Sequence, residues 1–114
     1  MRQYIGMDSL VATLFVMKYD KGETRISLDL LEQYEIEVER ILLAEKVDAV
    51  ILNYRYKLNS MLIDYADCFE ISNSDIVMKK NVNINFVKNK WINHFELDVI
   101  IALSKAYKNL KVEK

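Results

Sequence analysis

Short apolar stretches rich in β-branched and aromatic residues dominate the first part of the chain. Residues 2–7 and 11–19 have this composition, which is typical of half-buried strands. Residues 23–28 alternate polar and apolar side chains, which predicts one buried face. The intervening Asp-Lys-Gly at 20–22 suits a turn, because aspartate starts turns well and glycine adopts positive φ. The pattern predicts a β-hairpin that pairs 11–19 with 23–28.

A helical period replaces the alternation in residues 29–46. Apolar side chains recur there at spacings of three and four, at Leu31, Tyr34, Val38, Ile41 and Leu42. A strand at 34–38 is a competing interpretation, but the long run of helix formers favours the helix. The apolar run at 47–54 predicts a buried strand parallel to an earlier one. One long helix from 47 to 65 is the main alternative.

The second half of the chain predicts two helices and one strand. Residues 59–70 carry an apolar side suited to a helix, and the polar residues 72–75 predict a loop. Apolar residues alternate with asparagine in 82–86, which indicates a strand. A last helix is expected over 89–110, with a stripe formed by Trp91, Phe95, Val99, Ala102, Ala106 and Leu110.

The length and composition restrict the class of protein. A chain of 114 residues with 52% hydrophobic residues predicts a single globular domain, 1–114. The absence of proline and the presence of two glycines count against an all-β sandwich. The longest apolar run, 10–17, has eight residues, far short of the roughly 20 that a membrane-spanning helix needs. A single cysteine, Cys68, excludes an internal disulfide, and we expect a cytoplasmic protein without a membrane segment.

The net charge of −1 conceals an uneven distribution. Residues 1–75 hold 8 Lys/Arg and 14 Asp/Glu, a balance of −6, whereas residues 76–114 hold 8 Lys and 3 acids, a balance of +5. A basic last third suits contact with phosphate or with an acidic protein. The alternative is that its lysines only solvate the outer face of the last helix.

The order of elements, together with two short stretches of text, resembles the RNase H-like superfamily and most closely its RuvC/YqgF resolvase type. The stretches are Tyr4-Ile-Gly-Met-Asp8 at the beginning and Glu96-Leu-Asp98-Val-Ile-Ile-Ala-Leu103 near the end. The resemblance covers nearly the whole chain by element order. It implies an α/β fold in which a mixed sheet of about five strands, an antiparallel hairpin plus parallel strands, is flanked by three helices.

The resemblance also implies a metal-dependent nuclease that acts on branched or structured nucleic acid. In that family Asp8 and Asp98 would converge and hold Mg²⁺, whose bound water attacks the phosphodiester. Asn53 stands where the family usually has an acid. Phe95 stands three residues before the final aspartate, where the family usually has an acid or, in some members, a histidine. His94, four residues before Asp98, could substitute for the missing group.

Two further expectations follow from the resemblance. Either Asp64 or Asp67 supplies a missing ligand, or the site is degraded and the domain binds nucleic acid without cutting it. The backbone phosphates would be contacted by the lysines of the basic third: Lys79, Lys80, Lys88 and Lys90.

Structural interpretations of the same residues stay open. Asp8 could be the polar end of a strand or an N-terminal cap for the residues that follow it. Asp98 and His94 could be solvated surface residues, and Asn53 could simply end a strand. Three residues are expected mainly as core residues: Cys68, Trp91 and Phe95.

The alternative function is a small non-catalytic interaction protein, such as an immunity protein, an antitoxin or a phage-encoded inhibitor. Glu32, Glu35 and Glu39 are expected on one solvated face of the helix over 29–46. Such a face would cover a basic protein partner. A homodimer formed through an exposed apolar helix face is a third hypothesis.

Overall fold

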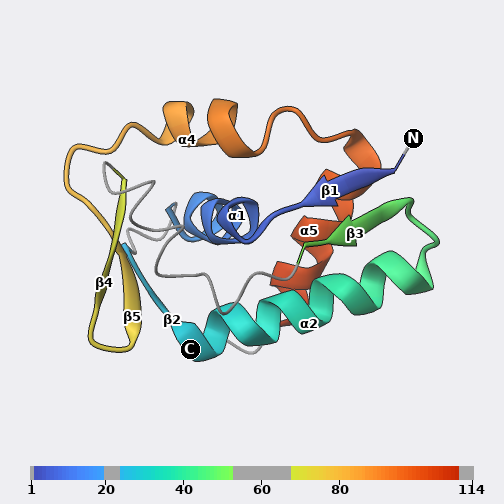
Figure 1. Cartoon of the computed structure of the whole chain (residues 1–114), viewed down its shortest axis with the longest axis horizontal. Helices are drawn as coiled ribbons and strands as arrows, with labels where there is room; N and C mark the ends of the chain where they lie inside the picture. Colours follow the sequence, from blue (N-terminus) through green and yellow to red (C-terminus); the bar gives the residue numbers. More distant parts are fainter. Residues whose placement is uncertain (1, 20–23, 53–67, 111–114) are drawn as a thin grey trace.

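A buried helix, α1 (Met7–Tyr19), lies at the centre of the fold, with the other elements packed around it (Figure 1). The computed structural model describes residues 2–19, 24–52 and 68–110. The remaining elements are β1 (Gln3–Ile5), β2 (Arg25–Ser27), α2 (Leu28–Ala44), β3 (Ala49–Ile51), β4 (Phe69–Ser72), β5 (Asp75–Met78), α4 (Ile84–Trp91) and α5 (Leu97–Asn109). Four helices and five strands are therefore described, with the strands divided between two small sheets.

The prediction of a strand at 11–19 is wrong, and so is the hairpin that it would form with 23–28. The segment belongs to α1, which begins after Gly6, whose carbonyl accepts the Leu10 N–H at 3.1 Å. Five of the six side chains from position 10 to position 15 are completely buried in this helix: Leu10, Val11, Ala12, Leu14 and Phe15. Because a helix covered on all sides shows no polar face, its sequence cannot be told from that of a buried strand by periodicity.

The helix expected over 29–46 is confirmed as α2. Ser27 caps its first turn, since the Ser27 Oγ accepts the Leu30 N–H at 3.0 Å. The five apolar residues predicted for its inner face are all buried: Leu31, Tyr34, Val38, Ile41 and Leu42. The competing strand at 34–38 is excluded. The solvated position expected for Glu35 is wrong, because this side chain is buried.

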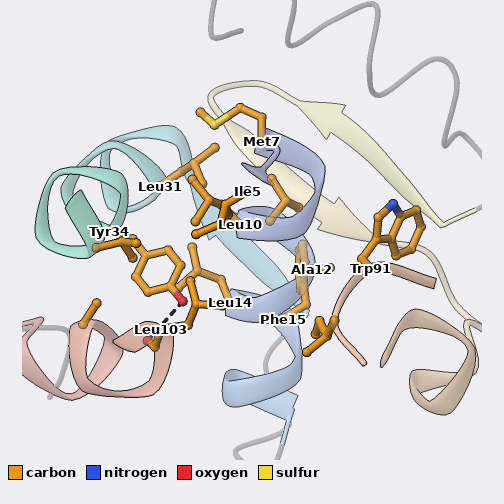
Figure 2. Packing of buried hydrophobic residues seen from close by; sticks show 14 of the residues in the cluster. Ile5, Met7, Leu10, Ala12, Leu14, Phe15, Leu31, Tyr34, Trp91 and Leu103 are labelled. Carbon is orange, nitrogen blue, oxygen red and sulfur yellow. Dashed lines mark hydrogen bonds between the residues drawn. The ribbon is translucent and has the colours of Figure 1, made fainter. Parts of the chain in front are cut away.

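Aromatic and polar contacts join the elements of the core (Figure 2). The buried Tyr34 hydroxyl donates to the Leu103 carbonyl at 3.2 Å and so connects α2 to α5. Burial raises the pKa of Tyr34 well above its usual value. On another side of α1, Phe15 stacks on Phe69 with a centroid distance of 5.1 Å, and Phe69 lies 5.5 Å from Trp91. These contacts link α1 to both β4 and α4.

The predicted parallel strand pair is present. β3 lies parallel to β1, with Gln3 opposite Ala49 and Ile5 opposite Ile51. Strand β3 is half-buried and shorter than the expected 47–54. The alternative of a long helix starting at 47 is excluded for residues 47–52, and its continuation lies outside the described residues.

The second sheet is antiparallel, in the order β2-β5-β4, and lies on the opposite side of α1 from the first sheet in the view of Figure 1. The expected loop at 72–75 is a tighter turn, because only Asn73 and Ser74 separate the paired strands, with Asn73 at φ 60°. The helix expected over 59–70 is wrong for 68–70, because Cys68 lies in a turn and 69–70 are strand. Residues 59–67 lie outside the described part.

The last third also differs from the prediction. The strand expected over 82–86 is wrong. Residues 84–86 begin helix α4, and the Asn83 Oδ1 caps this helix by accepting the Asn85 N–H at 2.8 Å. The helix expected over 89–110 is two helices, because α4 ends at Trp91 and α5 begins at Leu97. Its stripe is nevertheless buried at Val99, Ala102 and Ala106.

The fold is therefore mixed α/β, as expected, but its described strands form a parallel pair and an antiparallel triplet instead of one mixed sheet. Four helices are described instead of the three expected. Across residues 2–19, 24–52 and 68–110, no helix has both the length and the apolar character needed to cross a membrane.

Candidate functional site

Asp8 is the second residue of α1 and is half-buried. Its Oδ1 accepts the N–H of Ser9 at 2.8 Å. The first N–H groups of a helix have no partner within the helix, and a carboxylate there also complements the helix dipole. Asp8 therefore does the work of an N-terminal cap, although it stands inside the first turn rather than before it.

Asp98 occupies the same position in α5 and makes the same local bond, since its Oδ1 accepts the Val99 N–H at 2.8 Å. Gln3 joins this turn to β1. The Gln3 Oε1 accepts the Glu96 N–H at 2.8 Å, and the Gln3 Nε2 lies 3.5 Å from the Asp98 Oδ1. Asp98 is exposed, and its carboxylate is thus placed against the first residue of β1.

The two aspartates are associated with opposite ends of β1. Asp98 contacts Gln3, the first strand residue, whereas Asp8 follows the last strand residue, Ile5. In the described part of the chain, no group of three or more His, Cys, Asp or Glu side chains is placed to hold a metal ion. A Mg²⁺ site shared by Asp8 and Asp98 stays a prediction.

The other proposed site residues are dispersed. His94 is exposed in the turn between α4 and α5, where its ring lies 4.2 Å from that of Phe95. Phe95 is buried, so its core interpretation is confirmed. Asn53 lies outside the described residues, as do the two aspartates considered as replacement ligands, Asp64 and Asp67.

The four lysines proposed to contact phosphate lie on two segments. Lys79 and Lys80 follow β5, whereas Lys88 and Lys90 belong to α4. The Lys90 ammonium lies 5.8 Å from the ring centroid of Phe86 and 5.4 Å from that of Trp91. Lys90 is therefore engaged in cation–π contacts on the surface of α4.

The outer side of α2 carries a pattern that the sequence interpretation missed. Ile36 is 59% exposed and Leu43 is 76% exposed, and their spacing of seven residues places them on one side of the helix. Glu32 and Glu39 are also exposed, at four-residue spacing from Ile36 and Leu43 respectively. We call these four residues the α2 outer stripe. Ile36 was visible in the sequence, but its alternation with Tyr34 and Val38 indicated a strand and hid its exposed position.

A polar cluster lies at the edge of α2 that faces α5. Arg40 pairs with Glu37 through two hydrogen bonds, and the Asn109 Nδ2 donates to the Glu37 Oε2 at 2.7 Å. The Arg40 hydrogen bonds, followed by the Asn109 bond, lower the pKa of Glu37. Farther along, the Lys105 Nζ lies 2.7 Å from the Glu45 Oε2. The Asn109 and Lys105 contacts connect α2 to α5, whereas the Arg40 pair lies within α2.

No family model matches the chain, and no curated protein or solved structure matches it either.

Proposed function

We propose that this protein is a small non-catalytic interaction module that binds a basic protein partner through the α2 outer stripe. The observation that carries the proposal is the exposure of Ile36 and Leu43 on one side of α2, next to the exposed acids Glu32 and Glu39. A helix in a globular protein normally turns its large aliphatic residues inward. Here the inner side of α2 is already filled by its own buried residues, so the two outer aliphatics do not serve this core.

The chemistry of the stripe indicates the kind of partner. Aliphatic anchors two turns apart on one helix face suit an apolar groove, as in other helix-in-groove complexes. The acids beside them favour lysine or arginine at the rim of that groove, because rim charges guide association and reject partners of like charge. The excess of acids in residues 1–75 also attracts a basic partner, over a longer range.

The two aspartates proposed as metal ligands have a sufficient structural explanation. Each accepts a backbone N–H in the first turn of its helix. This supports a binding function over hydrolysis, because neither carboxylate requires a metal to account for its place.

Capture from a lysate of the source organism, with matched variants, tests the proposal. The variant Ile36→Ser/Leu43→Ser alters the stripe, and Ile71→Ser/Leu97→Ser makes an equivalent change at exposed positions on β4 and α5. We expect a basic protein to be recovered by the wild type and by the control variant, and to be lost with the stripe variant. Equal recovery by all three proteins, or recovery of no specific protein, would contradict the proposal.

The Mg²⁺-dependent hydrolysis implied by the family resemblance has its own test. A branched DNA substrate is incubated with the wild type and with Asp8→Asn in the presence of Mg²⁺. Cleavage by the wild type that is lost in Asp8→Asn would overturn the non-catalytic proposal. Absence of cleavage by both proteins is the result that we expect.

A further inference from the structure

A cavity of about 530 Å³ lies between α1, α4 and α5. Its apolar wall includes Val16 and Met17 from the last part of α1 and Ile84 from the start of α4. Its polar wall includes Lys88 from α4 and Lys108 from α5. The volume is within the range of sites that hold small organic molecules, roughly 300–1,000 Å³.

Among the described residues that line the cavity, the charged ones are all basic. Lys88 and Lys108 contribute ammonium groups, and none of the described residues lining it is an aspartate or a glutamate. Lys88 is half-buried in α4, whereas Lys108 is exposed in α5. Two cations beside an apolar wall select a ligand that has both an anionic group and an apolar body.

Tyr107 adds an independent observation. Its side chain lines the cavity, and its hydroxyl is buried without a hydrogen-bond partner within the described part of the protein. A buried polar atom without a partner is costly and uncommon in folded proteins, and it calls for an explanation. The hydroxyl is closed off from solvent, so a ligand oxygen supplies the missing partner only when the Tyr107 side chain turns toward the cavity.

We propose that this cavity binds a small amphipathic organic acid. The apolar body of the ligand packs against Val16, Met17 and Ile84, and its acidic group lies between Lys88 and Lys108. The Tyr107 side chain turns toward the cavity, and its hydroxyl donates to an oxygen of the ligand. The cavity is formed by other residues than the α2 outer stripe, so this site stands or fails independently of the proposed protein partner.

A pair of related dyes provides the probe. Anilinonaphthalene sulfonate has an apolar aromatic body and one permanent anionic group, and N-phenylnaphthylamine has the same ring framework without the anion. Both increase their fluorescence on entering an apolar site. We expect one sulfonate dye to bind per chain, and the neutral dye to bind about tenfold more weakly because it lacks the charge-assisted contacts.

Variants of equal charge change identify the site. Lys88→Gln/Lys108→Gln removes both ammonium groups from the cavity, and Lys79→Gln/Lys80→Gln removes two from the segment after β5. The first variant should weaken binding of the sulfonate dye by about tenfold, and the second by less than about twofold. Equal weakening by both variants would show general attraction to a basic surface and would overturn the proposal.

Tyr107→Phe tests the buried hydroxyl. We expect it to weaken binding of the sulfonate dye by about fivefold, through loss of one hydrogen bond. Binding of the neutral dye should be unchanged. An unchanged affinity for the sulfonate dye would remove Tyr107 from the proposed site.

Nuclear magnetic resonance of the wild-type protein locates the dye without any substitution. The methyl signals of Val16, Met17 and Ile84 should shift during titration with the sulfonate dye, and those of Ile36 and Leu43 should not. Shifts confined to residues outside the cavity would overturn the proposal, whatever the stability of the lysine and tyrosine variants.

Discussion

Gly6 and Asp8 are coupled at the beginning of α1. A Cβ atom on Gly6 would collide with the Asp8 Oδ1, the same oxygen that accepts the Ser9 N–H. The absence of a side chain at position 6 therefore permits the carboxylate to remain in place. This is a local reason for a Gly-hydrophobic-Asp sequence that needs no metal.

A double-mutant cycle tests this coupling. Gly6→Ala should displace the carboxylate and destabilise the protein by less than about 1 kcal/mol, because the lower entropy of alanine in the unfolded chain partly offsets the lost N-terminal bond. In the Asp8→Ala background, Gly6→Ala should lower the free energy of unfolding markedly less, because the hydrogen bond between Asp8 and the Ser9 N–H is already lost. Urea unfolding of the four proteins provides the free energies. Strictly additive costs would show that the two positions act independently.

Glu37 gives the edge of α2 a dependence on pH. Hydrogen bonds from Arg40 and Asn109 lower its pKa in the folded protein, so they stabilise the ionised form. A group with a lowered folded pKa stabilises the fold above its unfolded pKa and loses this contribution as pH falls through the folded value. The contribution of Glu37 is thus complete at neutral pH and disappears in acid.

Glu37→Gln provides the comparison. The wild type should be more stable than the variant at pH 7, and the difference should shrink as pH falls below about 4.3, the ordinary pKa of glutamate. Because the side chain is partly exposed, we expect a small difference at every pH. Thermal unfolding of both proteins from pH 7 to pH 3 measures it. A difference that grows in acid would contradict the direction of the pKa shift.

At the scale of elements, the end of α2 is closed by a residue in an unfavourable conformation. Lys46 has φ 56°, and the Val47 N–H donates back to the Leu42 carbonyl at 3.0 Å while the Lys46 N–H donates to the Leu43 carbonyl. This pair of bonds is a Schellman motif, whose left-handed position is usually glycine. A side chain at that position costs roughly 1 kcal/mol.

Lys46→Gly should therefore stabilise the protein by up to about 1 kcal/mol, less the extra entropy that glycine gains in the unfolded chain. Lys105→Gly, within helix α5, is the opposite control and should destabilise by at least about 1 kcal/mol, because it also removes the ion pair with Glu45. Chemical denaturation measures both changes. A loss of stability in Lys46→Gly would show that its side chain makes a contact that offsets the backbone cost.

The sequence predicted best the elements whose pattern is set by their immediate surroundings, which are α2 and β3. Helix α2 was predicted because its apolar residues repeat at helical spacing. Ser27 caps the start of the helix, and Lys46, with its positive φ, follows the end. Strand β3 was predicted because it is a short apolar run after a helix. Both patterns record a local environment that repeats along the element.

The elements that failed are those whose environment depends on distant parts of the chain. Helix α1 has no solvated face because α2, α4, α5 and β2 all pack around it. The start of α4 alternates asparagine with apolar residues, but the cap at Asn83 decides for a helix. The break at 92–95 has no proline or glycine to mark it. The structural roles of Asp8 and Asp98 follow from the helices that begin beside them, so an incorrect element assignment at 11–19 also obscured the role of Asp8.

At the scale of the whole molecule, α1 packs against two sets of elements, which also meet where β2 runs into α2 and the Leu28 N–H donates to the Ser74 carbonyl at 3.0 Å. On one side lie α2 and α5, joined by Tyr34 and Leu103, and Figure 2 shows Leu14 directed toward them. On the other side, Phe15 stacks on Phe69 of β4. Because α1 contributes side chains to both sets, the fold should lose them together.

Substitution of Leu14 tests this central role. Leu14 is completely buried, and Leu14→Ala should cost about 2–5 kcal/mol, a large part of the roughly 5–15 kcal/mol that stabilises a domain. Leu97→Ala removes the same atoms from a side chain that is 70% exposed and should change stability by less than about 0.5 kcal/mol. Urea unfolding, followed by the fluorescence of Trp91 in α4 and by helical circular dichroism, measures both. If α1 couples the two sets, the two signals of Leu14→Ala shift to lower urea by the same amount and stay coincident. A fluorescence transition that separates from the circular dichroism transition would show that α4 and the β2-β5-β4 sheet unfold independently of α2 and α5, and α1 would then belong to only one of the two sets.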